Sequence, residues 1–279
     1  MLIWRKRVPA GDDEAWSARL LEFMERMAII SLPGGKSARI EAYALSAKEG
    51  AALVGRHGGG LRRLNERVFI QKKTSGRGPI RIRGKLLVVD SERERTAARR
   101  KFPGTKVLLV PASMAFGTGE HATTASCLRF LADMAARGGA GKWDMLDLGT
   151  GSGILALAAK ALGARRVDAF DFDPNAVRVA KENAQLNQIA GVHFARRDVL
   201  AWTSPRAYDV VAANLFSEVL IQAAPRIARA VKPGGCLIFS GIMRHQESEC
   251  VAVFRACGFI IKKISRKGKW VTTLAVKAA

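Results

Sequence analysis

The second half of the chain alternates between two hydrophobic patterns. Met145, Leu146 and Leu148 form a short apolar run that fits a buried strand, and residues 154–162 follow the helical period. This alternation predicts a parallel sheet with helices on both faces, an α/β fold of the Rossmann-like kind. Further strands are expected at 167–171, 192–195, 208–214 and 236–241, and further helices at 174–187, 217–230 and 244–256.

The end of the chain departs from this order. Phe259 to Ser265 and Trp270 to Val276 are two β-rich runs joined by a short polar connection, a pattern that predicts a C-terminal antiparallel hairpin. A parallel sheet closed by such a hairpin is expected of a class I methyltransferase, and the hairpin weakens the alternative of a dehydrogenase.

The first part of the chain has shorter units. Their order, βαββαβ, predicts a small ferredoxin-like α+β domain, followed by a hairpin across Gly84. We expect this domain over 1–92, a basic linker over 93–106 and the larger domain over 107–279. The strands are expected at 2–8, 29–32, 38–45 and 67–72, and the helices at 14–27 and 47–57.

Composition limits the expected cellular location of the protein and the chemical state of its cysteines. No run approaches the roughly 18 apolar residues of a membrane helix, and residues 1–8 lack the apolar core of a secretory signal, so a cytoplasmic protein without membrane contact is expected. The four cysteines show neither C-x-x-C spacing nor a histidine cluster nearby, which predicts reduced, mostly buried thiols and no metal site. They are Cys127, Cys236, Cys250 and Cys257.

The net charge of +22 indicates a polyanionic neighbourhood. Residues 62–106 are the most basic segment, with 15 Lys and Arg against 4 Asp and Glu. This segment is either a solvated linker helix or a contact for RNA, and its sequence leaves both interpretations open. Few aromatic residues are interleaved there, which argues against stacking on single-stranded nucleic acid.

A glycine turn follows the strand at 145–148. Gly149, Gly151 and Gly153 are spaced G-x-G-x-G, whereas the dinucleotide fingerprint is G-x-G-x-x-G. Glycines let the backbone approach a ligand, and the N–H groups at the start of the next helix attract negative charge. S-adenosylmethionine, one nucleoside with a charged tail, fits a turn that has no groove for a pyrophosphate.

Acidic residues follow the next two strands. Asp171 ends a strand about 20 residues after the glycine turn, where doubly wound folds place the carboxylate that binds ribose hydroxyls. Asp173 before Pro174 fits the N-cap of a helix. Asp198 follows the third strand and is a candidate to bind adenine or, alternatively, to cap a turn.

Asn214 ends the strand at 208–214, at the sheet edge where ligands bind in such folds. Its amide offers a carbonyl to hold an attacking amine. Thr123 and Thr124 precede an apolar helix and can cap it. His121 is expected to anchor the loop before them.

Five stretches together resemble the ribosomal protein L11 methyltransferase family, the PrmA type, over roughly residues 107–260. They are AFGTGEHATT at 115–124, DLGTGSGILALAA at 147–159, DFDPNAV at 171–177, VVAANL at 210–215 and KPGGCLIFSGI at 232–242.

The resemblance implies a small substrate-recognition domain, a linker and an S-adenosylmethionine domain that methylates lysine side chains and an N-terminal amine of one large-subunit ribosomal protein. It places Asp171 at the ribose and Asn214 beside the methyl group and the incoming amine. It puts Phe116, Gly117, Thr118, Thr123 and Thr124 over the cofactor, and Asp147, Gly149, Gly151 and Gly153 around its methionine end.

Two alternatives stay open at this point. The first is a methyltransferase for another protein or a small amine. The second is a basic RNA-binding or ribosome-binding module that keeps the cofactor fold without catalysis.

Overall fold

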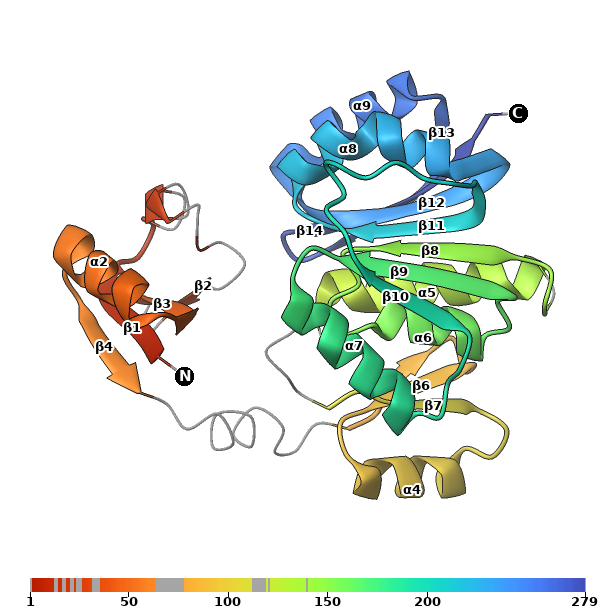
Figure 1. The fold of residues 1–279 in the computed structure, drawn as a ribbon, viewed down its shortest axis with the longest axis horizontal. Coiled ribbons are helices and arrows are strands. Elements are labelled where there is room, and N and C mark those ends of the chain that lie inside the picture. The colour runs from red at the N-terminus through yellow and green to blue at the C-terminus, as the bar shows by residue number, and fades with distance from the viewer. Residues whose placement is uncertain are drawn as a thin grey trace. The chain divides into compact units, whose positions relative to one another are not determined.

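The chain forms two compact units, Met1–Ser75 and Gly76–Ala279 (Figure 1). The structure is a computed structural model. It describes residues 2–12, 15–16, 19–20, 23, 27–31, 36–63, 78–111, 119, 121–138 and 140–278.

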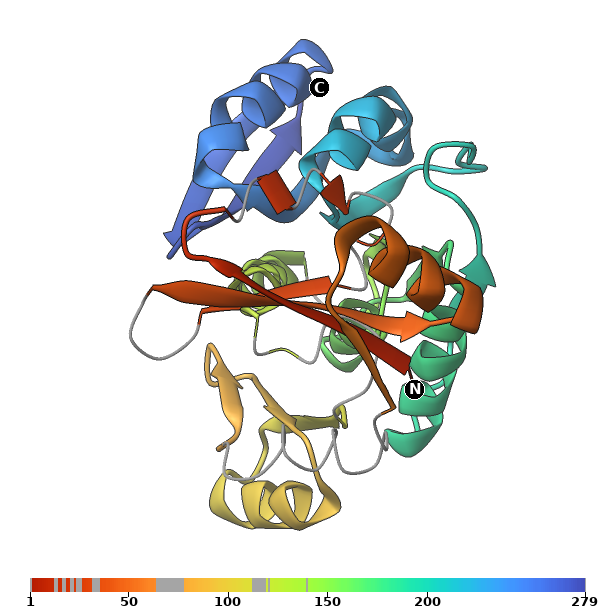
Figure 2. The ribbon, with the colours of Figure 1, turned by 90° about the vertical axis from the view of Figure 1, so that its left-hand side faces the viewer.

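The first unit contains a four-stranded antiparallel sheet in the order β2-β3-β1-β4. Helix α2 (Ala47–His57) contacts β1, β3 and β4 (Figure 2). It begins at a capping box, in which Ser46 and Glu49 each accept the other's backbone N–H. Trp4, Ile40 and Leu53 belong to the core of this unit. The strands are β1 (Leu2–Pro9), β2 (Met27–Ser31), β3 (Ser37–Leu45) and β4 (Gly60–Arg63).

The strand that follows α2 differs from the expected one. Residues 60–63 form β4 and pair with β1, whereas the strand expected at 67–72 lies outside the described residues. Gly58 and Gly59 make the turn with φ of 65° and 84°. A Cβ at Gly59 would lie 2.5 Å from the Arg5 carbonyl oxygen. The turn is therefore built for glycine, and it brings the chain back to β1 earlier than the hydrophobic pattern indicated.

The expected boundary at residue 92 is wrong. The hairpin of β5 (Ile80–Ile82) and β6 (Leu86–Val89) belongs to the second unit, where β6 pairs in parallel with β7 (Lys106–Leu109). Helix α4 (Glu92–Lys101) occupies most of the expected linker. Its Ala98 is buried in a cluster with Leu87, Val89 and Leu109, so burial of apolar side chains holds this basic segment in place.

The second unit is organised by a seven-stranded sheet in the order β10-β9-β8-β11-β12-β14-β13. The first five strands in this order are parallel, β14 runs antiparallel to β12, and β13 runs antiparallel to β14. The strands are β8 (Asp144–Leu148), β9 (Arg166–Asp171), β10 (Val192–Arg196), β11 (Tyr208–Asn214), β12 (Val231–Met243), β13 (Phe259–Lys267) and β14 (Trp270–Lys277).

Successive side chains on the central strands enter two different cores. Met145 and Val210 pack beneath α5 and α6, whereas Leu146 and Val211 pack beneath α8 and α9. Figure 1 shows α8 and α9 on one side of the sheet and α5, α6 and α7 on the other. These helices are α5 (Ala122–Gly138), α6 (Ile154–Ala161), α7 (Pro174–Leu186), α8 (Ser217–Ala230) and α9 (Glu247–Ala256).

Across the described part of the chain, every helix is too short or too polar to cross a membrane.

Candidate functional site

The glycine turn after β8 has a backbone that only glycine adopts easily. Gly149, Gly151 and Gly153 have φ of 68°, 54° and 81°. A Cβ at Gly149 would lie 2.3 Å from Leu215 Cδ2, and a Cβ at Gly153 would lie 2.9 Å from Ala180 Cβ. The turn is thus both strained for other residues and closely packed, and it begins α6 directly behind the strand.

Asp171 at the end of β9 is tied to this turn. Its Oδ2 accepts the Gly151 N–H at 2.9 Å, and its Oδ1 accepts the Asp173 N–H at 3.1 Å. Burial raises the pKa of Asp171, and these N–H donors partly offset that effect. Each carboxylate oxygen keeps a second lone pair, so Asp171 can accept hydroxyl groups of a ligand as well.

Asp147, which precedes the turn, is only 1% exposed. Its Oδ2 accepts the Thr150 hydroxyl at 2.6 Å, while Oδ1 is buried and has no hydrogen-bond partner of good geometry in the described part of the chain. Burial raises the pKa of Asp147 to about 7, against the smaller opposing effects of the Thr150 hydroxyl and the Ala156 N–H. A buried carboxylate with a vacant oxygen is costly and favours a donor from outside the chain.

Asn214 ends β11 on the side of α5. Its Nδ2 lies 3.5 Å from Thr124 Oγ1, a long hydrogen bond, and its Oδ1 is buried without a partner among the described residues. Thr124 itself is 1% exposed. The amide is therefore positioned at the start of α5, and its carbonyl oxygen is the group left to accept a further hydrogen bond.

Asp147 and Asn214 belong to a polar layer that also includes Ser240 and Thr272. Asn214 lies opposite Ser240 in the β11–β12 register, and Ser240 lies opposite Thr272. The Ser240 hydroxyl donates to the Val271 carbonyl at 2.8 Å and lies 2.7 Å from the Thr272 hydroxyl. The layer replaces the apolar core at the strand ends beneath α5, which makes this edge of the sheet chemically distinct.

The first turn of α5 is fastened by His121. Its Nδ1 lies 2.7 Å from Thr123 Oγ1, and its ring packs edge-on against Trp270 with 4.7 Å between centroids. Burial, with a smaller effect of the Lys269 charge, lowers the pKa of His121. The geometry agrees with an anchoring role.

Asp198 lies apart from these contacts. It is exposed, and its Oδ1 accepts the Leu200 N–H at 2.8 Å in a turn. Its role at the adenine stays a prediction. Phe116, Gly117 and Thr118 lie outside the described residues, so their expected role stays a prediction too.

Two residues at this edge escaped the sequence analysis. The Leu215 side chain covers Gly149, and a Cβ at Gly241 would lie 2.2 Å from the Leu215 carbonyl oxygen. Phe172 follows Asp171 and is 52% exposed, which is unusual for a large apolar side chain. They lie in the motifs VVAANL and DFDPNAV, in which the sequence pattern points to the polar residues Asn214 and Asp171 instead.

Comparison with known proteins decides the family. The model of the family "Ribosomal protein L11 methyltransferase (PrmA)" matches residues 18–278. The chain belongs to this family. The resemblance found in the sequence is thereby confirmed.

Two family relatives and one solved structure illustrate the similarity. Ribosomal protein L11 methyltransferase of Chloroflexus aurantiacus is 43% identical over 195 residues, or 61% of this chain and 58% of that protein. The Pelotomaculum thermopropionicum protein of the same name is 41% identical over 198 residues, or 71% of this chain and 61% of that protein. The crystal structure of a ribosomal protein L11 methylase from Lactobacillus delbrueckii subsp. bulgaricus has a TM-score of 0.63 at 26% identity, and covers 73% of this chain and all of that one.

The chain spans only part of its relatives' length. The matched segments cover between 53% and 61% of the first four relatives. The solved structure supports the Rossmann-like α/β sheet expected from the sequence.

Gly149→Ala is expected to disturb the cofactor site through its new contact with Leu215. Overpacking costs about 1–3 kcal/mol, so the affinity for S-adenosylhomocysteine should fall about tenfold or more when measured by calorimetry. Gly234→Ala is the matched control, because Gly234 has a similar φ of 72° with open space around its Cβ position. Equal affinities of the two variants would show that the packing at Gly149 does not shape the site.

Asp147→Asn is expected to change how thermal stability depends on pH. The folded state raises the pKa of Asp147 to about 7, from an ordinary value of about 4. Folding therefore favours the protonated carboxyl, and its stabilising effect is lost as pH rises from about 4 to about 7. The melting temperature of Asp147→Asn relative to the unsubstituted protein should rise over this range. Parallel curves for the two proteins would contradict this.

Proposed function

We propose that the protein transfers methyl groups from S-adenosylmethionine to amino groups of ribosomal protein L11, on lysine side chains, the N-terminal amine or both. Membership of the family supports the reaction and the substrate. The observation that carries the proposal is the vacant, buried Oδ1 of Asn214 beside the glycine turn. An acceptor oxygen at this place suits an incoming N–H donor.

The residues present fit the cofactor. Asp147 Oδ1, a buried oxygen at this edge, has no hydrogen-bond partner of good geometry among the described residues and needs a donor. Asp147 would hold the charged methionine end, and Asp171 would accept the ribose hydroxyls. Phe172 is exposed next to Asp171 and offers an apolar surface for a flat base. When bound, S-adenosylmethionine supplies a methyl group on a positively charged sulfur.

Asn214 orients the acceptor in this proposal. Its Nδ2 faces Thr124 Oγ1 at 3.5 Å, which leaves Oδ1 to accept a hydrogen bond from the amine. Alignment of donor and acceptor is the main task of such a site, because the leaving group is already activated. A deprotonated amine needs no strong base, and His121 is occupied with Thr123 and Trp270.

The first unit supplies substrate recognition in the same proposal. Its antiparallel order β2-β3-β1-β4 supports a ferredoxin-like fold, which commonly presents surfaces to macromolecules.

The antiparallel β13 and β14 of the second unit support a class I methyltransferase sheet. A contact of basic residues 62–106 with ribosomal RNA and a cytoplasmic location belong to this proposal as well.

Transfer of labelled methyl groups tests the function directly. The protein is incubated with tritiated S-adenosylmethionine and either free L11 or ribosomes that lack the modification, and the products are resolved by mass. Label in L11 is expected. Label in another protein or in a small amine would show that L11 is not the substrate and would leave the reaction type unchanged. Cofactor binding without any methyl transfer would favour the non-catalytic alternative.

Asn214→Ala is expected to reduce turnover by about 100-fold, the size of effect seen when a single positioned hydrogen-bond group is removed from a reacting centre. Affinity for S-adenosylhomocysteine should stay within about threefold, or less than about 1 kcal/mol, because in this proposal the amide carbonyl faces the incoming amine and not the cofactor. Asn175→Ala, at an exposed position on α7, serves as the control. Unchanged turnover in Asn214→Ala would remove Asn214 from the mechanism.

A further inference from the structure

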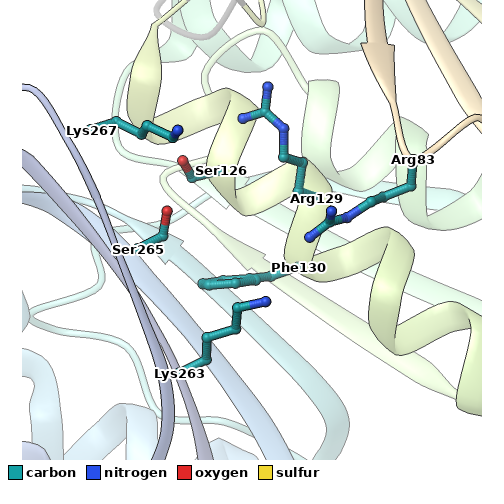
Figure 3. Close-up of a pocket in the computed structure, with 7 residues that line it drawn as sticks. All are labelled: Arg83, Ser126, Arg129, Phe130, Lys263, Ser265 and Lys267. Atoms are coloured by element: carbon teal, nitrogen blue, oxygen red, sulfur yellow. The ribbon is translucent and has the colours of Figure 1, made fainter.

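A basic pocket of about 330 Å³ lies in the second unit, between α5 and the edge strand β13. Four cationic side chains, two hydroxyl groups and a phenyl ring line it (Figure 3). None of these residues belongs to the site at the strand ends. The pocket is nevertheless near that site along α5. Thr124, which contacts Asn214, and Arg129, which lines the pocket, are five residues apart on this helix, which corresponds to about 8 Å along the helix axis.

The two elements present these side chains through their own periodicities. Lys263, Ser265 and Lys267 occupy alternate positions of β13 and therefore share one face, while Ile264 packs into the core beneath α8 and α9. Ser126, Arg129 and Phe130 are spaced i, i+3, i+4 on α5 and share one side of that helix. In Figure 3 the Ser126 and Ser265 side chains are drawn between those of Lys267 and Lys263.

Three of the four cations are not neutralised. Arg83 forms a bidentate ion pair with Asp133, with both contacts at 2.9 Å. In contrast, Arg129, Lys263 and Lys267 form no ion pair with any described residue, and Lys263 Nζ lies 5.6 Å from the Phe130 ring centre. Positive charges held close together without anions repel one another, so this arrangement favours an anionic ligand.

The hydroxyl groups point to the kind of anion. Ser126 is 3% exposed, and neither it nor Ser265 has a hydrogen-bond partner in the described ranges of the chain. The pocket thus offers O–H donors in addition to cations, an arrangement that suits a phosphate with several acceptor oxygens better than a carboxylate with two.

The surroundings favour a polymer over a single ion. Exposed Lys269 follows the pocket residues of β13 in the turn to β14. A row of cations along one strand can follow successive phosphates of a backbone, whereas a free phosphate would use the central pocket only. We propose that this pocket binds the phosphate backbone of RNA. The inference does not depend on the identity of the methyl acceptor.

The test uses the full chain and a fluorescent single-stranded RNA of about 20 nucleotides, longer than one typical binding site. The triple variant Arg129→Gln, Lys263→Gln, Lys267→Gln removes the three unpaired cations. Binding is followed by anisotropy between about 50 and 200 mM salt. Loss of three phosphate contacts should weaken binding about tenfold or more and reduce the slope of log Kd against log salt by about 2.

The matched control removes the same charge elsewhere, at exposed Lys181, Arg206 and Arg255. These positions lie outside the pocket, and salt screens charges separated by more than about 10 Å, so Kd should stay within about twofold. Melting curves of both variants verify that they are folded. Equal loss of RNA binding in both triple variants would overturn the proposal, as would pocket-dependent binding of polyglutamate without pocket-dependent binding of RNA.

Methyl transfer to free L11, measured on the same preparations, separates the two proposals. A pocket variant that loses RNA binding and keeps transfer supports the RNA site. An unsubstituted protein that binds RNA through the pocket without transferring methyl groups would count against the proposed function only.

Discussion

Burial of the central sheet on both faces is the constraint from which the site follows. Side chains in the middle of β8, β11 and β12 point into one of two apolar cores, where an unpaired polar group would cost several kcal/mol, on the order of 2–7. Polar residues are therefore confined to the strand ends. Asp147, Asn214 and Ser240 appear there on one face only, beneath α5. The site is the place where the hydrophobic core stops.

Leu215 contacts the glycine turn and β12 at this edge of the sheet. Its N–H donates to the Ser240 carbonyl at 3.0 Å, and its side chain covers Gly149. Its own carbonyl sits where a Cβ of residue 241 would be, which explains a glycine at that position. One apolar residue thus sets the spacing between the glycine turn, the end of β11 and β12, and thereby the position of the neighbouring Asn214.

The sequence predicted what local patterns encode. The strand predicted at 208–214 and the helix predicted at 217–230 have the same bounds as β11 and α8. Their hydrophobic periods are properties of consecutive residues and can therefore be recognised in the sequence. The contact of Asp171 with Gly151 follows from two adjacent strands with their turns. The boundary near residue 92 was wrong because charge dominates 92–101, while the burial of Ala98 depends on a sheet that forms only in three dimensions.

The sequence shows Arg83 within the basic segment 62–106, but it does not show the basic pocket. Arg83, Arg129 and Lys263 come from a turn, a helix and an edge strand, and only the fold brings them together. Asp147 was expected from its motif, but its vacant oxygen and raised pKa are consequences of packing. Patterns in a sequence show which residue types are available at a strand end, whereas their solvation depends on the neighbours.

Among the strands that the structure describes, only β14 pairs with β13, which leaves the other edge of β13 without a partner strand. Unpaired N–H and C=O groups along such an edge are a template for another strand and can start aggregation. Lys262, Lys263 and Lys267 place charge along this strand, and charge is one of the means by which soluble proteins prevent edge-to-edge pairing. Replacing these lysines with apolar residues would remove that charge from the edge strand, so edge pairing limits the substitutions that β13 can accept.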